Sequence, residues 1–180
     1  MVGALVLTVA GCSGSGSDQP KVLPPVPSAT VAVTPTPTTT AAPVVVPSAA
    51  VPATPQGAAA FVRFFYGELN GAFQDGHDER IRRLSDRLCA TCNNYANAVL
   101  AGAKTNSRIV GITFGSLEVA AALPNNGVTL VTVLGSVPKR QENKNGVLST
   151  LTAEGPFNDT VALQRHGNRW LVRAIRFEKR

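Results

Sequence analysis

Helical spacing first appears in the segment around Gly57. Its apolar residues recur every three or four positions, which predicts an amphipathic helix that buries one face. These residues are Ala59, Phe61, Phe64, Phe65, Leu69, Ala72 and Phe73. We expect the helix to begin at Thr54-Pro55 or Gln56 and to end at Asp75-Gly76, because proline suits a first helical turn and glycine a C-terminal cap.

Two further helices are predicted before Asn106. The stretch DERIRRLSD should form a short helix that buries Ile81 and Leu84. A third helix should run from Asp86 or Arg87 to about Lys104. Its expected buried residues are Leu88, Cys92, Tyr95, Ala96, Val99 and Leu100.

After Asn106 the chain consists of segments rich in Val, Ile, Thr, Leu and Phe, which predict strands. The expected strands are Ser107–Leu123, Val128–Lys139, Gly146–Glu154, Phe157–Arg165 and Arg169–Glu178. Turns at 124–127, 142–146, 154–156 and 166–168 separate them, and connections this short join antiparallel neighbours. Gly111 and Gly115 flank Thr113 in the first strand, which we therefore expect to bend sharply.

The chain begins MVGALVLTVAGCSGSGS, in which an apolar run precedes small residues and a cysteine. The run is too short for a bilayer core of about 30 Å, which takes roughly 20 residues, and it suits a secretory signal. Val9-Ala10-Gly11-Cys12 resembles the bacterial lipobox, which implies acyl chains such as palmitate on Cys12. No Lys or Arg precedes the run, so we expect a signal peptide over 1–11 whose N-terminus is truncated by a start codon assigned too late. The alternative, a buried apolar N-terminus with a chance cysteine, is disfavoured because the following residues suit no core.

Residues 12–56 are dominated by Pro, Thr, Ala, Val and Ser, and their only charges are Asp18 and Lys21. Each proline fixes φ and removes an N–H, so we expect polyproline II rather than helix or sheet. We favour a spacer that carries the folded part away from the membrane. The alternatives are a Pro-rich ligand for a receptor and an O-glycosylated segment at Thr34 to Thr40. Residues 57–180 suit one domain with a modest core.

Three helices followed by a bent antiparallel sheet is the element order of the cone-shaped α+β fold of nuclear transport factor 2 and ketosteroid isomerase. The segments TPQGAAAFVRFFYGELNGAFQDG and IRRLSDRLCATCNNY, with a strand beginning SRIVG, resemble an uncharacterised family of actinobacterial lipoproteins. That family combines a lipobox, a Thr/Pro-rich linker and an S-x-x-x-C-x-x-C segment, here Ser85, Cys89 and Cys92. The resemblance covers residues 54–114 well and the sheet in outline. It implies the fold and the location, the outer face of the cytoplasmic membrane with the domain in the cell-wall space, but no activity.

With Cys12 acylated, Cys89 and Cys92 form an even pair in an oxidising compartment, where a disulfide is the default. We favour a structural staple over a redox centre. A helix N-terminus lowers the pKa of a thiol, but a thioredoxin-like motif follows a strand, and none precedes this pair. A zinc site is disfavoured because His77 and His166 show no ligand spacing. We expect no metal and no cofactor.

Polar residues on apolar faces are the remaining candidates for a site in the pocket of a cone fold. Tyr66 and Tyr95 lie on helices that should cover the pocket, and Glu118 and Arg173 lie in predicted strands. A buried Glu118–Arg173 pair would be a proton-transfer candidate. We favour a structural ion pair or two exposed side chains. No catalytic set is evident.

The chain has 17 Lys and Arg against 11 Asp and Glu, a net charge of +6. Outside the membrane, anionic wall polymer or lipid headgroups are the expected partners of such a charge, and nucleic acid is not. Simple solubility explains the charge equally well. Its two basic clusters are Arg80, Arg82, Arg83 and Arg87, and Arg165, Arg169, Arg173, Arg176, Lys179 and Arg180.

Together these features predict a membrane-anchored lipoprotein with a non-enzymatic binding or scaffold domain at the cell wall. Its partner would be a small apolar ligand, an envelope protein or wall polymer. The alternative is a pocket enzyme of the ketosteroid-isomerase-like type, or a thiol-disulfide oxidoreductase using Cys89 and Cys92. Pocket residues with strongly shifted pKa values would favour the enzyme, and an all-apolar cavity would favour binding.

Overall fold

The computed structural model describes residues 43–122, 124 and 126–178. The expected signal peptide over 1–11, the lipobox Cys12 and most of the expected linker lie outside these residues. Within the described part, no helix combines the length and the apolar composition that a membrane crossing requires.

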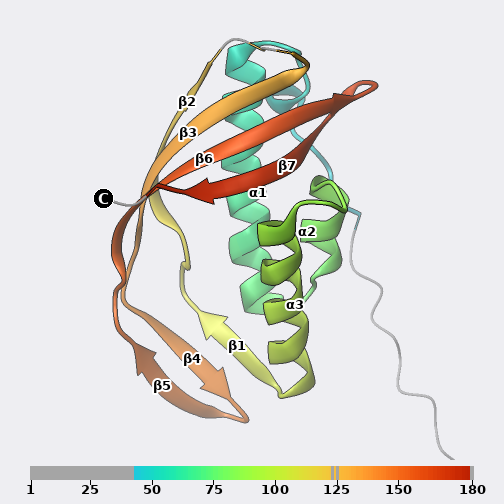
Figure 1. Cartoon of the computed structure of the whole chain (residues 1–180). Coiled ribbons are helices and arrows are strands. Elements are labelled where there is room, and N and C mark those ends of the chain that lie inside the picture. The colour runs from blue at the N-terminus through green and yellow to red at the C-terminus, as the bar shows by residue number, and fades with distance from the viewer. Residues whose placement is uncertain (1–42, 123, 125, 179–180) are drawn as a thin grey trace, which may run out of the picture. The chain divides into compact units, whose positions relative to one another are not determined.

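The domain consists of helices followed by two antiparallel sheets (Figure 1). The helices are η1 (Ser48–Ala50), α1 (Pro55–Asp75), α2 (Glu79–Leu84) and α3 (Ala90–Lys104). The strands are β1 (Ser107–Val110), β2 (Gly115–Ala121), β3 (Val128–Val137), β4 (Arg140–Lys144), β5 (Val147–Leu151), β6 (Gly155–His166) and β7 (Arg169–Phe177). One sheet has the strand order β2-β3-β6-β7, and the other has the order β1-β4-β5.

The strands form three long extended segments, β1–β2, β3–β4 and β5–β6. Each segment is interrupted at the same level, and these breaks bend the sheet. Residues 111–114 separate β1 from β2, Pro138-Lys139 separate β3 from β4, and 152–154 separate β5 from β6. Pairing continues on both sides, because β3 pairs with β6 before the break and β4 with β5 beyond it. Figure 1 shows the strands curving around the helices. The predicted fold class is confirmed: an α+β domain with N-terminal helices packed on a strongly bent antiparallel sheet, the nuclear transport factor 2-like cone.

Helix α1 forms where the apolar spacing predicted it. Thr54 Oγ1 accepts a hydrogen bond from the Gly57 N–H at 3.1 Å, and Pro55 occupies the first turn. Gly76 ends the helix at φ 82°, with its N–H donating to the Ala72 carbonyl at 2.8 Å. The largest fully buried side chains of this helix are Phe61, Val62, Phe65, Tyr66 and Leu69. Because each such apolar side chain contributes about 1.5–3 kcal/mol on burial, α1 is the centre of the core.

Helix α3 begins at Ala90, about one turn later than predicted. The preceding segment lies along β7 instead, where the Asp86 N–H donates to the Val172 carbonyl at 2.8 Å. Leu88, predicted to be buried, is 80% exposed. The prediction was wrong here because Ser85 is extended and bridges Val172, so the helix begins only after the turn at Arg87-Leu88.

Two predicted turns belong to strands. Residues 142–144 continue β4, and the turn itself consists of Asn145 and Gly146, with φ values of 54° and 84°. Two residues of positive φ form the hairpin turn whose twist matches antiparallel strands. Gly155 and Pro156 begin β6, opposite Val137 and Ser136 of β3.

The last part of the expected linker packs on the domain. Val44 and Val46 contact the core, and Ala50 is buried. The carbonyl of Pro52 accepts a hydrogen bond from Trp170 Nε1 at 3.1 Å. The folded part therefore begins well before the predicted boundary at residue 57, because Val and Ala side chains among the prolines find an apolar surface on β7 and α1.

Candidate functional site

The bend of the sheet leaves a cavity of about 400 Å³ beside the helices. Volumes of roughly 300–1,000 Å³ are typical of small-molecule sites. Apolar side chains, five of them aromatic, make most of its wall, and a smaller part is polar. The lining residues are Phe73, Tyr95, Ile109, Thr113, Phe114, Val137, Arg140, Glu154, Phe157, Asp159 and Phe177.

Ring contacts hold the aromatic wall in place around Phe114. The rings of Tyr66, Tyr95 and Phe157 lie edge-on to it, with centroid distances of 5.3, 5.8 and 5.8 Å. Phe73 packs edge-on against Tyr95 at 6.3 Å. Such edge-to-face pairs are the arrangement that aromatic rings prefer. The wall is therefore a preformed apolar surface.

One buried carboxyl group, Asp159 on β6, faces the cavity. Its side chain belongs to a residue only 1% exposed, and its Oδ2 accepts a hydrogen bond from the Tyr66 hydroxyl at 2.6 Å. Burial raises the pKa of Asp159 because the charged form loses its hydration, and the bond from Tyr66 lowers it in part. The carboxyl group thus keeps its proton to a higher pH than an exposed aspartate.

Both tyrosines at the cavity remain hydrogen-bond donors. Burial raises the pKa of Tyr66 and of Tyr95 far above the ordinary value for tyrosine, and the negative charge of Asp159 raises both pKa values further. The neutral hydroxyl is the form that donates. At physiological pH these residues therefore offer protons to hydrogen bonds and do not act as phenolate bases.

Three residues of the wall carry polar atoms with no hydrogen-bond partner among the described residues. The atoms are Thr113 Oγ1, Asp159 Oδ1, and Nε and Nη1 of Arg140. The remaining nitrogen of Arg140, Nη2, donates to Glu154 Oε1 at 2.9 Å. Buried polar groups are nearly always paired, so these atoms mark positions where a ligand or water completes the site.

The four predicted pocket residues fall into two environments. Tyr95 lines the cavity, and Tyr66 lies next to it through its bond to Asp159. Glu118 and Arg173 are exposed on β2 and β7, which form opposite edges of the four-stranded sheet. The hypothesis of a buried Glu118–Arg173 proton-transfer pair is therefore wrong. The structure instead contains two exposed side chains, which is one of the interpretations that we favoured.

An irregularity in β7 places Arg173 outside the core. Ala162 of β6 pairs with Ala174, whereas the next residue, Leu163, pairs with Val172, so Arg173 is skipped. Its Nη1 instead donates to Gln164 Oε1 at 3.1 Å. The regular alternation assumed from the sequence does not hold across such a bulge.

Sequence reasoning missed Asp159 and Arg140. Asp159 has the same alternation phase in β6 as Val161 and Leu163, which are fully buried. A charged residue in that phase was a signal for a buried polar site. Arg140 gave no such signal, because it lies at the break between β3 and β4, where the sequence shows no regular period.

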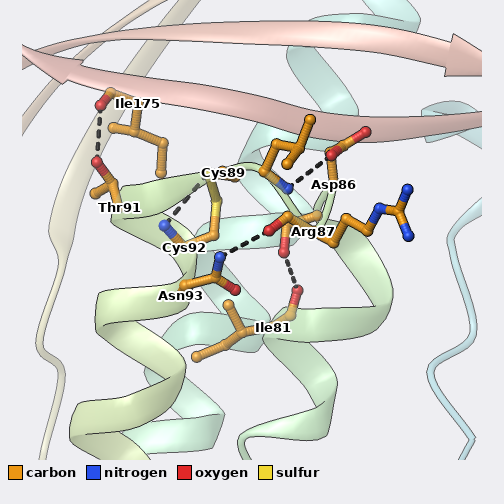
Figure 2. The surroundings of a disulfide bond; sticks show 10 residues. Ile81, Asp86, Arg87, Cys89, Thr91, Cys92, Asn93 and Ile175 are labelled. Atoms are coloured by element: carbon orange, nitrogen blue, oxygen red, sulfur yellow. Dashed lines mark hydrogen bonds between the residues drawn. A yellow bond between two sulfur atoms is a disulfide. The ribbon is translucent and has the colours of Figure 1, made fainter.

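The predicted disulfide joins Cys89 and Cys92, whose Cα atoms are 5.3 Å apart (Figure 2). Both residues are fully buried. Cys89 is the N-cap of α3, and its Sγ accepts a hydrogen bond from the Cys92 N–H at 3.3 Å. Thiol-disulfide exchange needs access of an attacking thiolate to a sulfur atom, so the burial favours a staple over a redox centre.

The disulfide lies where the α2–α3 connection meets β7. Thr91 Oγ1 donates to the Ile175 carbonyl at 3.0 Å, and Asn93 Nδ2 donates to the Arg87 carbonyl at 2.8 Å (Figure 2).

No group of three or more His, Cys, Asp and Glu side chains is placed to hold a metal ion within the described part of the chain.

Two of the four arginines of the first basic cluster are paired with acidic side chains. Arg80 lies 2.7 Å from Asp75 and 3.4 Å from Glu68, and Arg82 lies 2.6 Å from Asp78. The binding of anionic wall polymer or lipid headgroups by this cluster stays a prediction.

No protein-family model and no curated protein matches the chain. Among solved structures, the intermembrane space region of the chloroplast protein ARC6 is similar, with a TM-score of 0.52 at 9% identity over 71% of this chain and 98% of that one. Aln2 from a Streptomyces species is similar with a TM-score of 0.42 at 11% identity, over 66% of this chain and 87% of that one. At this identity the likeness to ARC6 shows the fold alone, and the looser likeness to Aln2 supports no inference.

Removal of the disulfide should destabilise the domain modestly. The closed loop is short, so Cys89→Ala/Cys92→Ala should cost less than the roughly 3 kcal/mol typical of a fifteen-residue loop. Cys89→Ser/Cys92→Ala keeps an N-cap acceptor and should recover about 1 kcal/mol of the loss. Denaturant unfolding measures both variants. Rapid maleimide labelling of the native wild type in a glutathione buffer would instead show an accessible redox pair.

Asp159→Asn should alter how stability depends on pH. The folded-state pKa of Asp159 is raised, so the folded state keeps a proton that the unfolded chain has already released. Wild-type stability therefore falls as pH rises from the ordinary aspartate pKa to the raised one. Asparagine does not ionise, so the Tm of the variant should not fall across this window. The Tm of the variant minus that of the wild type should therefore increase as pH rises through the window and then become constant. Thermal unfolding across pH, with the exposed Glu118→Gln as control, tests this, and a difference that does not change with pH contradicts it.

Proposed function

We propose that this protein is an extracytoplasmic lipoprotein whose folded domain binds a small, mainly apolar molecule in its aromatic cavity. Acylated Cys12 would hold it on the outer face of the cytoplasmic membrane, in keeping with the actinobacterial lipoproteins that its sequence resembles. The cavity of about 400 Å³ and its wall of five aromatic residues carry the binding function. Apolar lining with a few polar groups is typical of sites that bind small molecules.

Binding accounts for the rigid wall better than scaffolding does. A scaffold needs an outer surface, whereas four of the five aromatic residues of the wall pack against other rings and border free volume. The neutral hydroxyl of Tyr95 and the Thr113 hydroxyl offer hydrogen bonds that would orient a ligand. The rings would supply most of the affinity, because apolar contact area is their main contribution.

A pocket enzyme is the second candidate, and the buried Asp159–Tyr66 pair supports it. A carboxyl group with a raised pKa can act as a general acid, and such groups cluster at active sites. Among the described lining residues, however, the only other carboxylate is Glu154, whose side chain is 68% exposed and paired with Arg140. General acid–base catalysis usually needs two groups with separated pKa values facing one substrate. Burial of both sulfur atoms argues against the thiol-disulfide oxidoreductase.

Partly filling the cavity should weaken binding. Val137 lines the cavity, and Val137→Phe would occupy part of its volume. Isothermal titration with naphthamide and naphthoic acid as apolar probes should show at least about a tenfold loss of affinity, or 1.4 kcal/mol. Val147→Phe, on the exposed face of β5, is the matched control and should bind as the wild type does. Circular dichroism checks that both variants fold. If a folded Val137→Phe variant binds the probes as tightly as the wild type does, the proposal is wrong.

Lipid anchoring should be visible in the mature protein. When the protein is produced with a basic segment fused ahead of residue 1, intact-mass spectrometry should show cleavage immediately before Cys12 and two or more acyl chains on that residue. Cys12→Ser should move the protein from the membrane to the soluble fraction. An unmodified Cys12 in mature protein would refute the anchor.

A further inference from the structure

We propose that the cavity selects molecules that join an apolar body to a carboxylate, with Arg140 binding the carboxylate and the aromatic wall holding the body. This inference rests on the proposed binding function and names the class of ligand. It follows from which polar groups in the wall have a hydrogen-bond partner and which have none among the described residues.

Arg140 is the only cation that lines the cavity among the described residues. Its side chain is 12% exposed, and two of its three guanidinium nitrogens, Nε and Nη1, are buried without an acceptor in the described part. A guanidinium group has five N–H donors in a fixed planar fork and no acceptor, a shape that matches a carboxylate. These buried donors need an oxygen acceptor that the described residues do not supply, and a ligand carboxylate would provide it.

Glu154 does not meet this requirement. It accepts one hydrogen bond from Nη2 at 2.9 Å, while most of its side chain is in solvent. An ion pair this exposed is weak and screened by salt. Nε and Nη1 lack an acceptor among the described residues, and a second carboxylate would supply one.

Two other strand segments provide further polar atoms to the same cavity. Thr113 precedes β2 and is held there by its own N–H, which donates to Asn70 Oδ1 at 3.0 Å. Its Oγ1 has no partner among the described residues, and neither has Oδ1 of Asp159. The polar lining of the wall thus combines two groups that can donate to a ligand oxygen, Arg140 and the Thr113 hydroxyl, with the carboxyl groups of Asp159 and Glu154.

A cationic ligand fits the cavity less well. An ammonium group would lie beside the guanidinium of Arg140, and like charges at close range in an apolar site repel strongly. The buried carboxyl of Asp159 resists ionisation, because burial raises its pKa, so it does not offset that repulsion at low pH. An anionic group instead meets the opposite charge of the Arg140 guanidinium, which lines the cavity.

The test compares an acid with its uncharged amide. The probes are naphthoic acid with naphthamide, and a medium-chain fatty acid with its amide, titrated into the full chain carrying Cys12→Ser so that no acyl group competes. The wild-type cavity should bind each acid at least about tenfold more tightly than its amide, as expected for a desolvated charge-assisted contact. Arg140→Met, which keeps the aliphatic stem, should remove the preference without weakening the amides. Arg140→Lys should retain part of it, because lysine keeps the charge and loses the fork.

Arg173→Met is the matched control, since Arg173 is exposed on β7 and does not line the cavity. It should keep the full preference for acids. Equal affinity of acid and amide in the wild type overturns the inference, even if the Arg140 variants fail to fold, and leaves the proposed binding function intact. If none of the probes binds, and native mass spectrometry of protein purified from cells finds no retained molecule, both proposals fail.

Discussion

The bend that three long strands share is the constraint on which the rest of the domain depends. A break in one strand alone would leave its neighbours with unpaired backbone groups, so the three interruptions must occur at one level. Each has a local cause: Gly111 at φ 101°, Pro138 without an N–H, and Gly155 at φ 84°. The sheet can then curve around the helices while its ladders stay intact on both sides of the bend.

The cavity and its chemistry follow from this curvature. The sheet bends around α1 and α3, and the aromatic rings only partly fill the volume between them. Residues in or beside the breaks, Thr113 and Arg140, direct polar groups into that volume. Asp159 adds a carboxyl group whose protonation is governed by burial and by Tyr66. A polar site thus lies within a largely apolar wall, the combination that gives small-molecule sites both affinity and orientation.

The end of the helical layer that carries the α2–α3 connection is stabilised by other contacts. The disulfide, the Thr91–Ile175 contact and the backbone bond from Asp86 to Val172 all fasten the α2–α3 connection to β7. The segment from residue 43 to Pro52 covers the same strand, with Trp170 as its anchor. These contacts lie away from the aromatic cavity, so they support the scaffold and leave the cavity wall free for binding.

Local chemistry alone determined much of this protein. The spacing and caps of α1, the class of fold, the Asn-Gly positions that permit tight turns and the cysteine pair at i, i+3 are all properties of residues close together in sequence, and all were predictable. Asp159 was also detectable from its phase in β6, and Tyr66 was a candidate from the sequence, but their pairing was not predictable because the two residues are 93 positions apart. The late start of α3, the outward turn of Arg173 and the buried donors of Arg140 were likewise decided only in the tertiary structure. Each depends on strand register, on a bulge or on a coordinated break, and these are set by pairing between distant segments rather than by any local pattern.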